Sequence, residues 1–146
     1  MIGVVVVTHG QLATELVNAA ETIVGDLPHF FAVSIGWHED VQDARAEIAA
    51  AIEKVRQPGG VLLATDMFGG TPSNLAITFL EQDKIEIVTG VNLPMLIKAA
   101  SIAEPASLVE VARVLREHGR NAIWVASDLL SGDSREPGAG NRDTEK

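Results

Sequence analysis

The chain has 146 residues, of which 47% are hydrophobic and 4% aromatic, and its formal net charge at pH 7 is −9. This acidity argues against a nucleic-acid or anionic-membrane surface and favours a protein partner with a basic patch. The absence of cysteine excludes a disulfide framework and a cysteine nucleophile, and the early apolar run is too short for a transmembrane helix, so we expect a cytoplasmic protein.

The chain opens with an apolar, mostly β-branched run over residues 2–7. Because apolar and polar residues do not alternate in it, the run predicts a strand buried on both faces, as in a parallel sheet covered by helices. Thr8, His9 and Gly10 follow, and apolar residues then recur at helical spacing as far as Gly25. His9 therefore stands at the carboxyl end of a strand, where open α/β sheets hold their ligands.

The same alternation of strand and helix continues along the chain. Thr71 is expected to be a helix N-cap and Pro72 the first helical residue. Residues 131–146 are rich in Gly, Ser, Pro and charge and predict a disordered polar tail after a single α/β domain over residues 1–130. The predicted strands are 30–35, 61–65 and 85–89, with 122–126 as a candidate fifth strand, and the predicted helices are 41–55, 72–80, 94–102 and 105–119.

Polar residues gather where these strands end. Asp66 follows the strand 61–65, so it lies on the same sheet edge as His9, and the two meet if the first and third strands are neighbours. A carboxylate on one nitrogen of an imidazole fixes the tautomer that leaves the other nitrogen free to attack. Gly69, Gly70 and Thr71, at the start of a helix, offer backbone N–H groups and a hydroxyl to a phosphoryl group. The parts of a phosphohistidine site are thus present.

The glycine-rich loops do not indicate nucleotide binding. No P-loop is present, because no glycine-rich loop is followed by Lys and then Ser or Thr. No dinucleotide fingerprint follows the first strand either. ATP is therefore not expected as the direct donor, and the phosphoryl group should come from another protein phosphate, with no metal and no cofactor.

Three segments, in order over residues 1–126, resemble the enzyme IIA component of the mannose family of the bacterial sugar phosphotransferase system: Val-Val-Thr-His9-Gly, Ala-Thr-Asp66-Met-Phe-Gly-Gly-Thr-Pro-Ser-Asn and Gly90-Val-Asn-Leu-Pro-Met-Leu. The resemblance implies a three-layer α/β sandwich with a four-stranded parallel sheet of order 2-1-3-4. A fifth, antiparallel edge strand would be exchanged between the subunits of a homodimer. It also implies that His9 is phosphorylated by the histidine-containing phosphocarrier protein, on the ring nitrogen remote from Asp66, and passes the group to a IIB protein.

The match of motifs assigns further roles. Asp66 would orient His9, and Gly69, Gly70 and Thr71 would receive the phosphoryl group, although family members commonly have serine where Thr71 stands. The family often carries a IIB domain after this one, whereas a short polar tail follows here, so we expect a separate acceptor. Four more residues are candidates for loop or partner contacts: Thr8, Phe68, Asn92 and Pro94.

Three other functions are alternatives to this one. The phosphotransfer subunit of a dihydroxyacetone kinase shares the fold and the early histidine, but the Gly-Gly-Thr-Pro and Val-Asn-Leu-Pro-Met-Leu stretches favour the mannose type. A histidine phosphatase needs an arginine immediately before its nucleophile, where this chain has Thr8. A purely regulatory module, in which phosphorylated His9 changes affinity for a target and no sugar is moved, stays open, as does the identity of any sugar.

Overall fold

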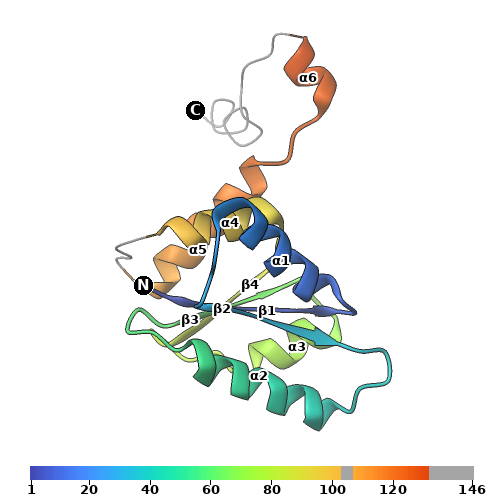
Figure 1. Ribbon diagram of the computed structural model, residues 1–146, viewed down its shortest axis with the longest axis vertical. Coiled ribbons are helices and arrows are strands. Elements are labelled where there is room, and N and C mark those ends of the chain that lie inside the picture. The colour runs from blue at the N-terminus through green and yellow to red at the C-terminus, as the bar shows by residue number, and fades with distance from the viewer. Residues whose placement is uncertain (103–106, 132–146) are drawn as a thin grey trace.

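The apolar runs of the chain form one parallel sheet (Figure 1). The structure is a computed structural model, and it describes residues 1–102 and 107–131. In these ranges the sheet has four strands in the order β2-β1-β3-β4, as the family resemblance implies. Their bounds are β1 Gly3–His9, β2 Phe30–Ile35, β3 Val61–Thr65 and β4 Ile85–Thr89.

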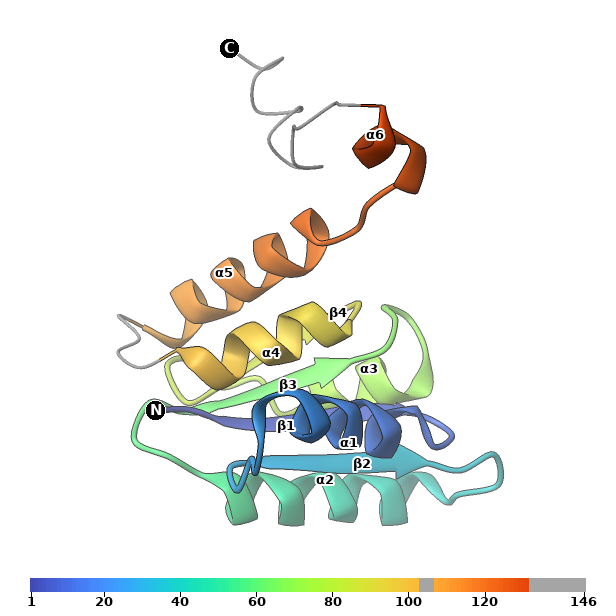
Figure 2. The ribbon, with the colours of Figure 1, turned by 45° about the horizontal axis from the view of Figure 1, so that its top comes forward.

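Helices cover both faces of the sheet, which explains why the first strand does not alternate (Figure 2). Val4 and Val6 pack into a core shared with α1, α4 and α5, and Val5 and Val7 pack into a second core shared with α2 and α3. All four valines are fully buried. The helices are α1 Leu12–Val24, α2 Val41–Val55, α3 Thr71–Ile77, α4 Leu93–Ser101, α5 Leu108–Asn121 and α6 Ala126–Leu130.

Helices α3 and α5 have bounds that differ from the prediction. Helix α3 begins at Thr71, with Gly70 as its N-cap, so Thr71 is not the cap, and the helix ends at Ile77 rather than near residue 80. Gly119 does not end α5, which continues to Asn121. A Cβ on Gly119 would lie 3.1 Å from Asn92 Oδ1, so this glycine lets α5 pack closely on the start of α4. Tertiary contact outweighs the helix-breaking tendency of glycine here.

The candidate fifth strand is not formed within the described chain. Residues 122–125 follow α5 without joining the sheet, and Ala126 begins α6 instead. Figures 1 and 2 show α5 leading the chain away from the sheet, so that α6 stands apart from β4. None of the helices in the described ranges has the length and apolar character needed to span a bilayer. Residues 132–146 of the predicted tail, and Pro105, where the last long helix was expected to begin, lie outside the described residues.

Candidate functional site

His9 and Asp66 meet at the carboxyl edge of the sheet, where β1 and β3 are neighbours. The Nδ1 atom of His9 lies 2.7 Å from Asp66 Oδ2, and the backbone N–H of His9 donates to the same oxygen at 2.9 Å. The backbone N–H of Met67 donates to the other carboxylate oxygen, also at 2.9 Å. The carboxylate is thus held in one orientation, and it holds the imidazole in turn.

These contacts determine the charge of Asp66. Partial burial by itself would raise its pKa, but the hydrogen bonds from the His9 backbone, the His9 ring and the Met67 backbone outweigh burial and lower the pKa of Asp66 below its ordinary value. The side chain of Asp66 is 13% exposed and that of His9 is 54% exposed. An ionised carboxylate therefore lies beneath an imidazole that solvent and a docking protein can reach.

The free side of the His9 ring faces Gly70. A Cβ at position 70 would lie 2.7 Å from Cε1 and 3.1 Å from Nε2 of His9, so only glycine leaves the ring in place. Gly69 has a φ of 97°, which side chains rarely adopt. The two glycines let the backbone pass close to Nε2, the nitrogen that Asp66 leaves free.

The fully buried Ser73 fastens this glycine loop, a role that the sequence reasoning missed. Its Oγ accepts from the N–H of Gly69 at 2.8 Å and donates to the carbonyl of Gly70 at 3.2 Å. The sequence feature that indicates this role is the position of Ser73 directly after Pro72 in the first turn of the helix, where a hydroxyl can hydrogen-bond to the preceding turn.

The loop leaves hydrogen-bond donors free beside the reactive nitrogen. Within the described residues, the N–H groups of Gly70 and Thr71 donate to no acceptor. Thr71 is exposed and, with His9, lines a hollow of about 430 Å³. Free N–H groups and a hydroxyl at the start of a helix suit the oxygens of an anion.

The four remaining candidates do not share one role. Thr8, expected to make a loop or partner contact, is fully buried, and its hydroxyl accepts from the N–H of Ala13 at 2.6 Å, so it supports the loop at the start of α1 and does not face a partner. Phe68 is 73% exposed beside the site. Asn92 caps α4 through the N–H of Met95 and donates to the carbonyl of Gly119, and Pro94 lies in the first turn of α4, so both shape the α4–α5 contact.

The comparisons with known proteins agree with this geometry. Residues 3–115 match the EIIA-man family, described as "PTS system fructose IIA component". The chain is 29% identical over 131 residues to the "PTS system fructose-specific EIIA component" of Bacillus subtilis, covering 89% of this chain and 90% of that protein. It is 30% identical over 129 residues to the mannose-specific EIIAB component of Escherichia coli, covering 84% of this chain but only 38% of that longer protein.

A solved structure shares the fold. The mannose/sorbose-specific IIA subunit from Enterococcus faecalis aligns with a TM-score of 0.75 and 27% identity, covering 84% of this chain and 92% of that one. These relatives support a phosphocarrier function in sugar phosphotransfer and do not favour a dihydroxyacetone kinase subunit. The chain belongs to the mannose-type enzyme IIA family of the bacterial sugar phosphotransferase system.

Proposed function

We propose that this chain carries the phosphoryl group as a phosphohistidine on Nε2 of His9. The observation that carries the proposal is the 2.7 Å contact between His9 Nδ1 and Asp66 Oδ2, which leaves Nε2 as the free nitrogen. The lone pair of Nε2 attacks phosphorus, and a new N–P bond forms while the N–P bond of the donor's phosphohistidine breaks. The donor imidazole leaves with that electron pair. Asp66 stabilises the positive charge that develops on the ring of His9.

The glycine loop would bind the phosphoryl oxygens. Gly70 lies against Nε2 of His9, and Thr71 lines the same hollow as His9, so their N–H groups and the Thr71 hydroxyl would meet the phosphoryl oxygens during transfer. Their arrangement exists before the group arrives, so little reorganisation is required at the moment of reaction. No nucleotide, metal or cofactor is needed for this step.

The donor is expected to be the histidine-containing phosphocarrier protein and the acceptor a IIB protein, both in the cytoplasm. The test is incubation with phosphoenolpyruvate, enzyme I and the phosphocarrier protein, followed by intact mass measurement. Wild type should gain one acid-labile phosphoryl group and His9→Ala none. Phosphorus NMR should place the group on Nε2. Labelling of His9→Ala would overturn the proposal.

The fate of the group separates transport from regulation. Phosphorylated protein mixed with a IIB protein of this class should lose its label to it. If the label stays on His9 with every IIB protein offered, the regulatory role, in which phosphorylation changes affinity for a target, is the better account.

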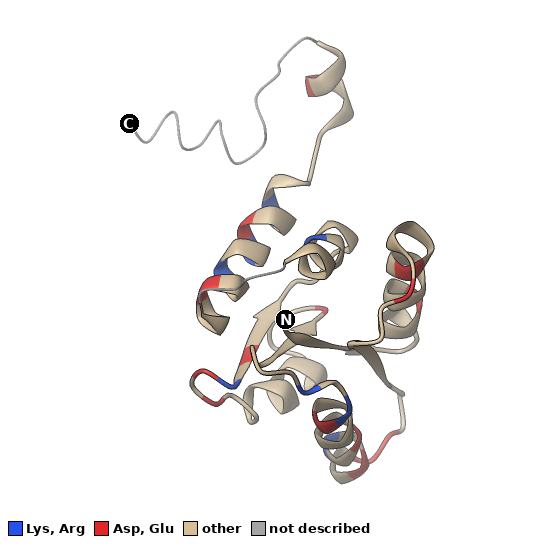
Figure 3. Cartoon of the chain, turned by 60° about the vertical axis from the view of Figure 1, so that its left-hand side comes forward, with Lys and Arg blue, Asp and Glu red and all other residues tan. Residues whose placement is uncertain are grey.

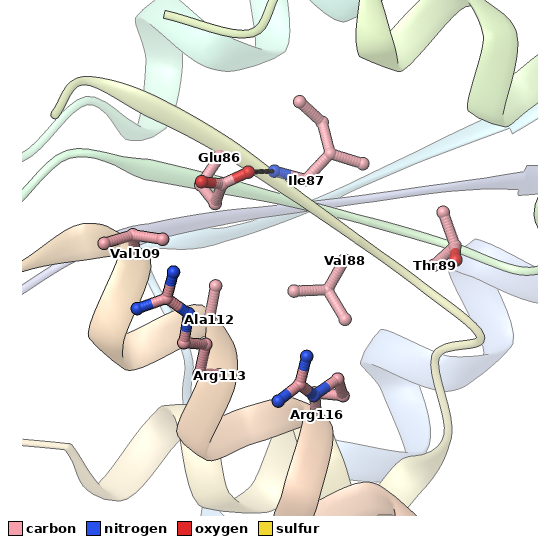
Figure 4. Close-up of a pocket in the computed structure, with 8 residues that line it drawn as sticks. All are labelled: Glu86, Ile87, Val88, Thr89, Val109, Ala112, Arg113 and Arg116. Atoms are coloured by element: carbon pink, nitrogen blue, oxygen red, sulfur yellow. Dashed lines mark hydrogen bonds between the residues drawn. The ribbon is translucent and has the colours of Figure 1, made fainter. Parts of the chain in front are cut away.

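We also propose that residues 122–126 form the exchanged strand of a homodimer. In the described part of the chain, β4 is the last strand of the sheet and no strand pairs with its outer side, where Glu81 alone forms a bridge to Ile85. The backbone N–H of Ile87 donates to the carboxylate of Glu86 at 3.0 Å. The Glu86 side chain thus takes a backbone donor of β4 that an added strand could bind instead. A groove of about 290 Å³ lies between β4 and α5. Figure 4 shows the residues that line it, with Arg113 and Arg116 among those from α5.

The chain also carries a segment suited to that groove. Ile123 and Val125 are 65% and 62% exposed, and Trp124 between them is 38% exposed. An apolar segment that the rest of the described chain leaves largely exposed, and an open sheet edge, complement one another in a second copy.

A further inference from the structure

Backbone N–H groups are what this site offers to the charge of a phosphoryl group. Residues 67–80, which include the glycine loop and α3, contain no charged side chain and are tan in Figure 3. In the described part of the chain, no Lys or Arg lines the hollow that His9 and Thr71 share. The phosphoryl oxygens would therefore be met by the Thr71 hydroxyl and by the N–H groups of Gly70 and Thr71, whose strength as donors depends on their direction.

One buried hydroxyl holds the backbone that carries these N–H groups. Ser73 Oγ accepts from the N–H of Gly69 at 2.8 Å and donates to the carbonyl of Gly70 at 3.2 Å. The exposed fraction of Ser73 is 0%, and the N–H of Gly69 has no other acceptor among the described residues. Gly69 has a φ of 97°, and a pair of glycines has wide conformational freedom, so the loop depends on this hydroxyl to keep one conformation.

The two bonds of Ser73 fix the peptide groups on either side of the Gly69–Gly70 peptide. A peptide group is planar and trans, so its C=O and its N–H point in opposite directions. The Gly70 carbonyl points at Ser73 and also accepts from the N–H of Asn74 at 2.9 Å. The N–H of Thr71, in the same peptide group, therefore points away from both. The N–H of Gly70 lies in the peptide between the two that Ser73 holds, so one hydroxyl constrains both N–H groups.

We propose that Ser73 is a positioning residue for phosphoryl transfer, which acts through the glycine loop and holds the N–H groups of Gly70 and Thr71 beside Nε2 of His9. This deepens the proposed function and depends on it. Because the hydroxyl is fully buried and bonded to the loop backbone, neither the phosphoryl group nor a docking protein touches it. Its loss should therefore slow the chemical step and leave the binding of the donor unchanged.

The test is single-turnover labelling of His9 over a range of concentrations of the phosphorylated donor, which gives the maximal rate and the half-saturating concentration. Ser73→Ala removes one oxygen atom and should lower the maximal rate about tenfold, with the half-saturating concentration within about twofold of wild type. Ser73→Cys, whose thiol is a weaker donor and acceptor, should give a rate between those of Ser73→Ala and wild type.

The matched control removes a hydroxyl from the C-terminal end of the same helix. Thr78 Oγ1 donates to the carbonyl of Leu75 at 2.6 Å and accepts from Arg45 at 2.8 Å. Thr78→Val keeps the shape of the side chain and loses both bonds, so it should weaken α3 without changing the rate of labelling. Thermal unfolding of both variants checks that each is folded at the temperature of the assay.

Amide NMR provides a readout that a purely structural role of Ser73 would not move. In wild type, the N–H signals of Gly70 and Thr71 should shift downfield when His9 is phosphorylated, because these groups then donate to phosphoryl oxygens. In Ser73→Ala both shifts should be much smaller, and the N–H of Gly69 should exchange faster with solvent. The control variant should keep the wild-type shifts.

The outcomes distinguish the positioning role from the proposed function. If wild type is not labelled at all, the proposed function fails, and the role of Ser73 fails with it. If wild type is labelled and Ser73→Ala keeps the wild-type maximal rate and amide shifts, only the positioning role is wrong. Equal loss of rate in Ser73→Ala and Thr78→Val would assign the effect to the stability of α3. A higher half-saturating concentration at an unchanged maximal rate would assign Ser73 to donor binding, and either result also overturns the inference.

Discussion

One carboxylate oxygen of Asp66 accepts from both the ring and the backbone of His9, so the two residues behave as one unit. Replacing Asp66 with Asn keeps the size of the side chain but removes its charge and presents an amide group that can no longer select the tautomer. We expect Asp66→Asn to slow phosphorylation of His9 about a hundredfold, in line with a misplaced reacting group. Rapid-quench labelling from the phosphorylated donor measures the rate.

The fold of this variant should survive, since Asp66 lies at the sheet edge and not in either core. Circular dichroism and thermal unfolding provide the control. Labelling of Asp66→Asn at the wild-type rate would contradict the orienting role.

Gly70 is the second residue that sets the position of the ring. Because a Cβ there would lie 2.7 Å from Cε1 of His9, Gly70→Ala must move either the ring or the loop. We expect the rate of labelling to fall at least tenfold, with most of the loss in the chemical step at saturating donor. Single-turnover kinetics measure it.

Glycine at position 10 provides the matched control, since a Cβ there would meet nothing within 4 Å although its φ is 56°. Gly10→Ala should cost some stability through this backbone conformation but should not displace the ring. Equal loss of rate in the two variants would show that backbone strain, and not contact with Nε2, limits the reaction.

The His9–Asp66 pair could be predicted from the sequence because both residues end apolar runs whose carboxyl ends must share one edge. The role of Ser73 could not, since it depends on the path of the glycine loop and on burial that no local pattern reveals. The same limit applies to Thr8, whose neighbour His9 is exposed while Thr8 itself is buried.

At the scale of elements, the strands β2, β3 and β4 have the predicted bounds, because each is an apolar run whose ends are marked by turn residues. The helix ends were less predictable. Gly119 is a helix breaker by local preference, yet α5 runs past it because it packs on Asn92, whose amide bonds its carbonyl at 2.9 Å. Such contacts join residues far apart in the chain, so the local spacing of apolar residues does not predict them.

Glu47 of α2 and Glu39, just before that helix, form a destabilising pair of acids that makes stability depend on pH. A hydrogen bond with Glu39, desolvation, and the charges of Glu39 and Asp43 raise the pKa of Glu47 to about 7. The folded state then binds a proton that the unfolded state releases near 4.5, so stability falls as pH rises from 4.5 through 7. Glu47→Gln removes this loss. We expect it to be more stable than wild type at pH 8 and equal to wild type near pH 4.5, measured by urea unfolding.

The control is Glu53→Gln, which removes an acid from the same helix that pairs with Arg56. The stability of Glu53→Gln relative to wild type should not increase as pH rises. If the Glu47→Gln advantage is the same at every pH, the contact with Glu39 is not its cause.

At the scale of the whole molecule, two groups stand out among the exposed apolar side chains. One surrounds His9, and the other lies after α5, at Ile123, Val125, Leu129 and Leu130. Only the second can complete the sheet, because only it lies outside the body that holds the sheet (Figure 1). The proposed fifth strand was expected from a resemblance and is not formed in the described chain, as expected of a strand that needs a partner to form.

The proposed exchange predicts that Trp124→Lys, which brings a cation to the groove that Arg113 and Arg116 line, weakens the dimer without unfolding the single chain. A charge in the middle of residues 122–126 would have to be buried in the partner's groove beside β4, which is unfavourable. In the single chain, Trp124 is 38% exposed and belongs to neither core, so the variant should keep its secondary structure. Sedimentation over a range of concentrations should show a dimer for wild type and at least a hundredfold higher dissociation constant for the variant.

The neutral replacement Trp124→Phe separates charge from size and should stay dimeric. Labelling of His9 in the monomeric variant then tests whether the site of one subunit works alone. We expect that it does, because His9, Asp66 and Gly70 all belong to the same chain. A wild-type protein that sediments as a monomer at every concentration would overturn the exchange while leaving the site intact. A dimer that Trp124→Lys does not disturb would place the interface elsewhere on the surface.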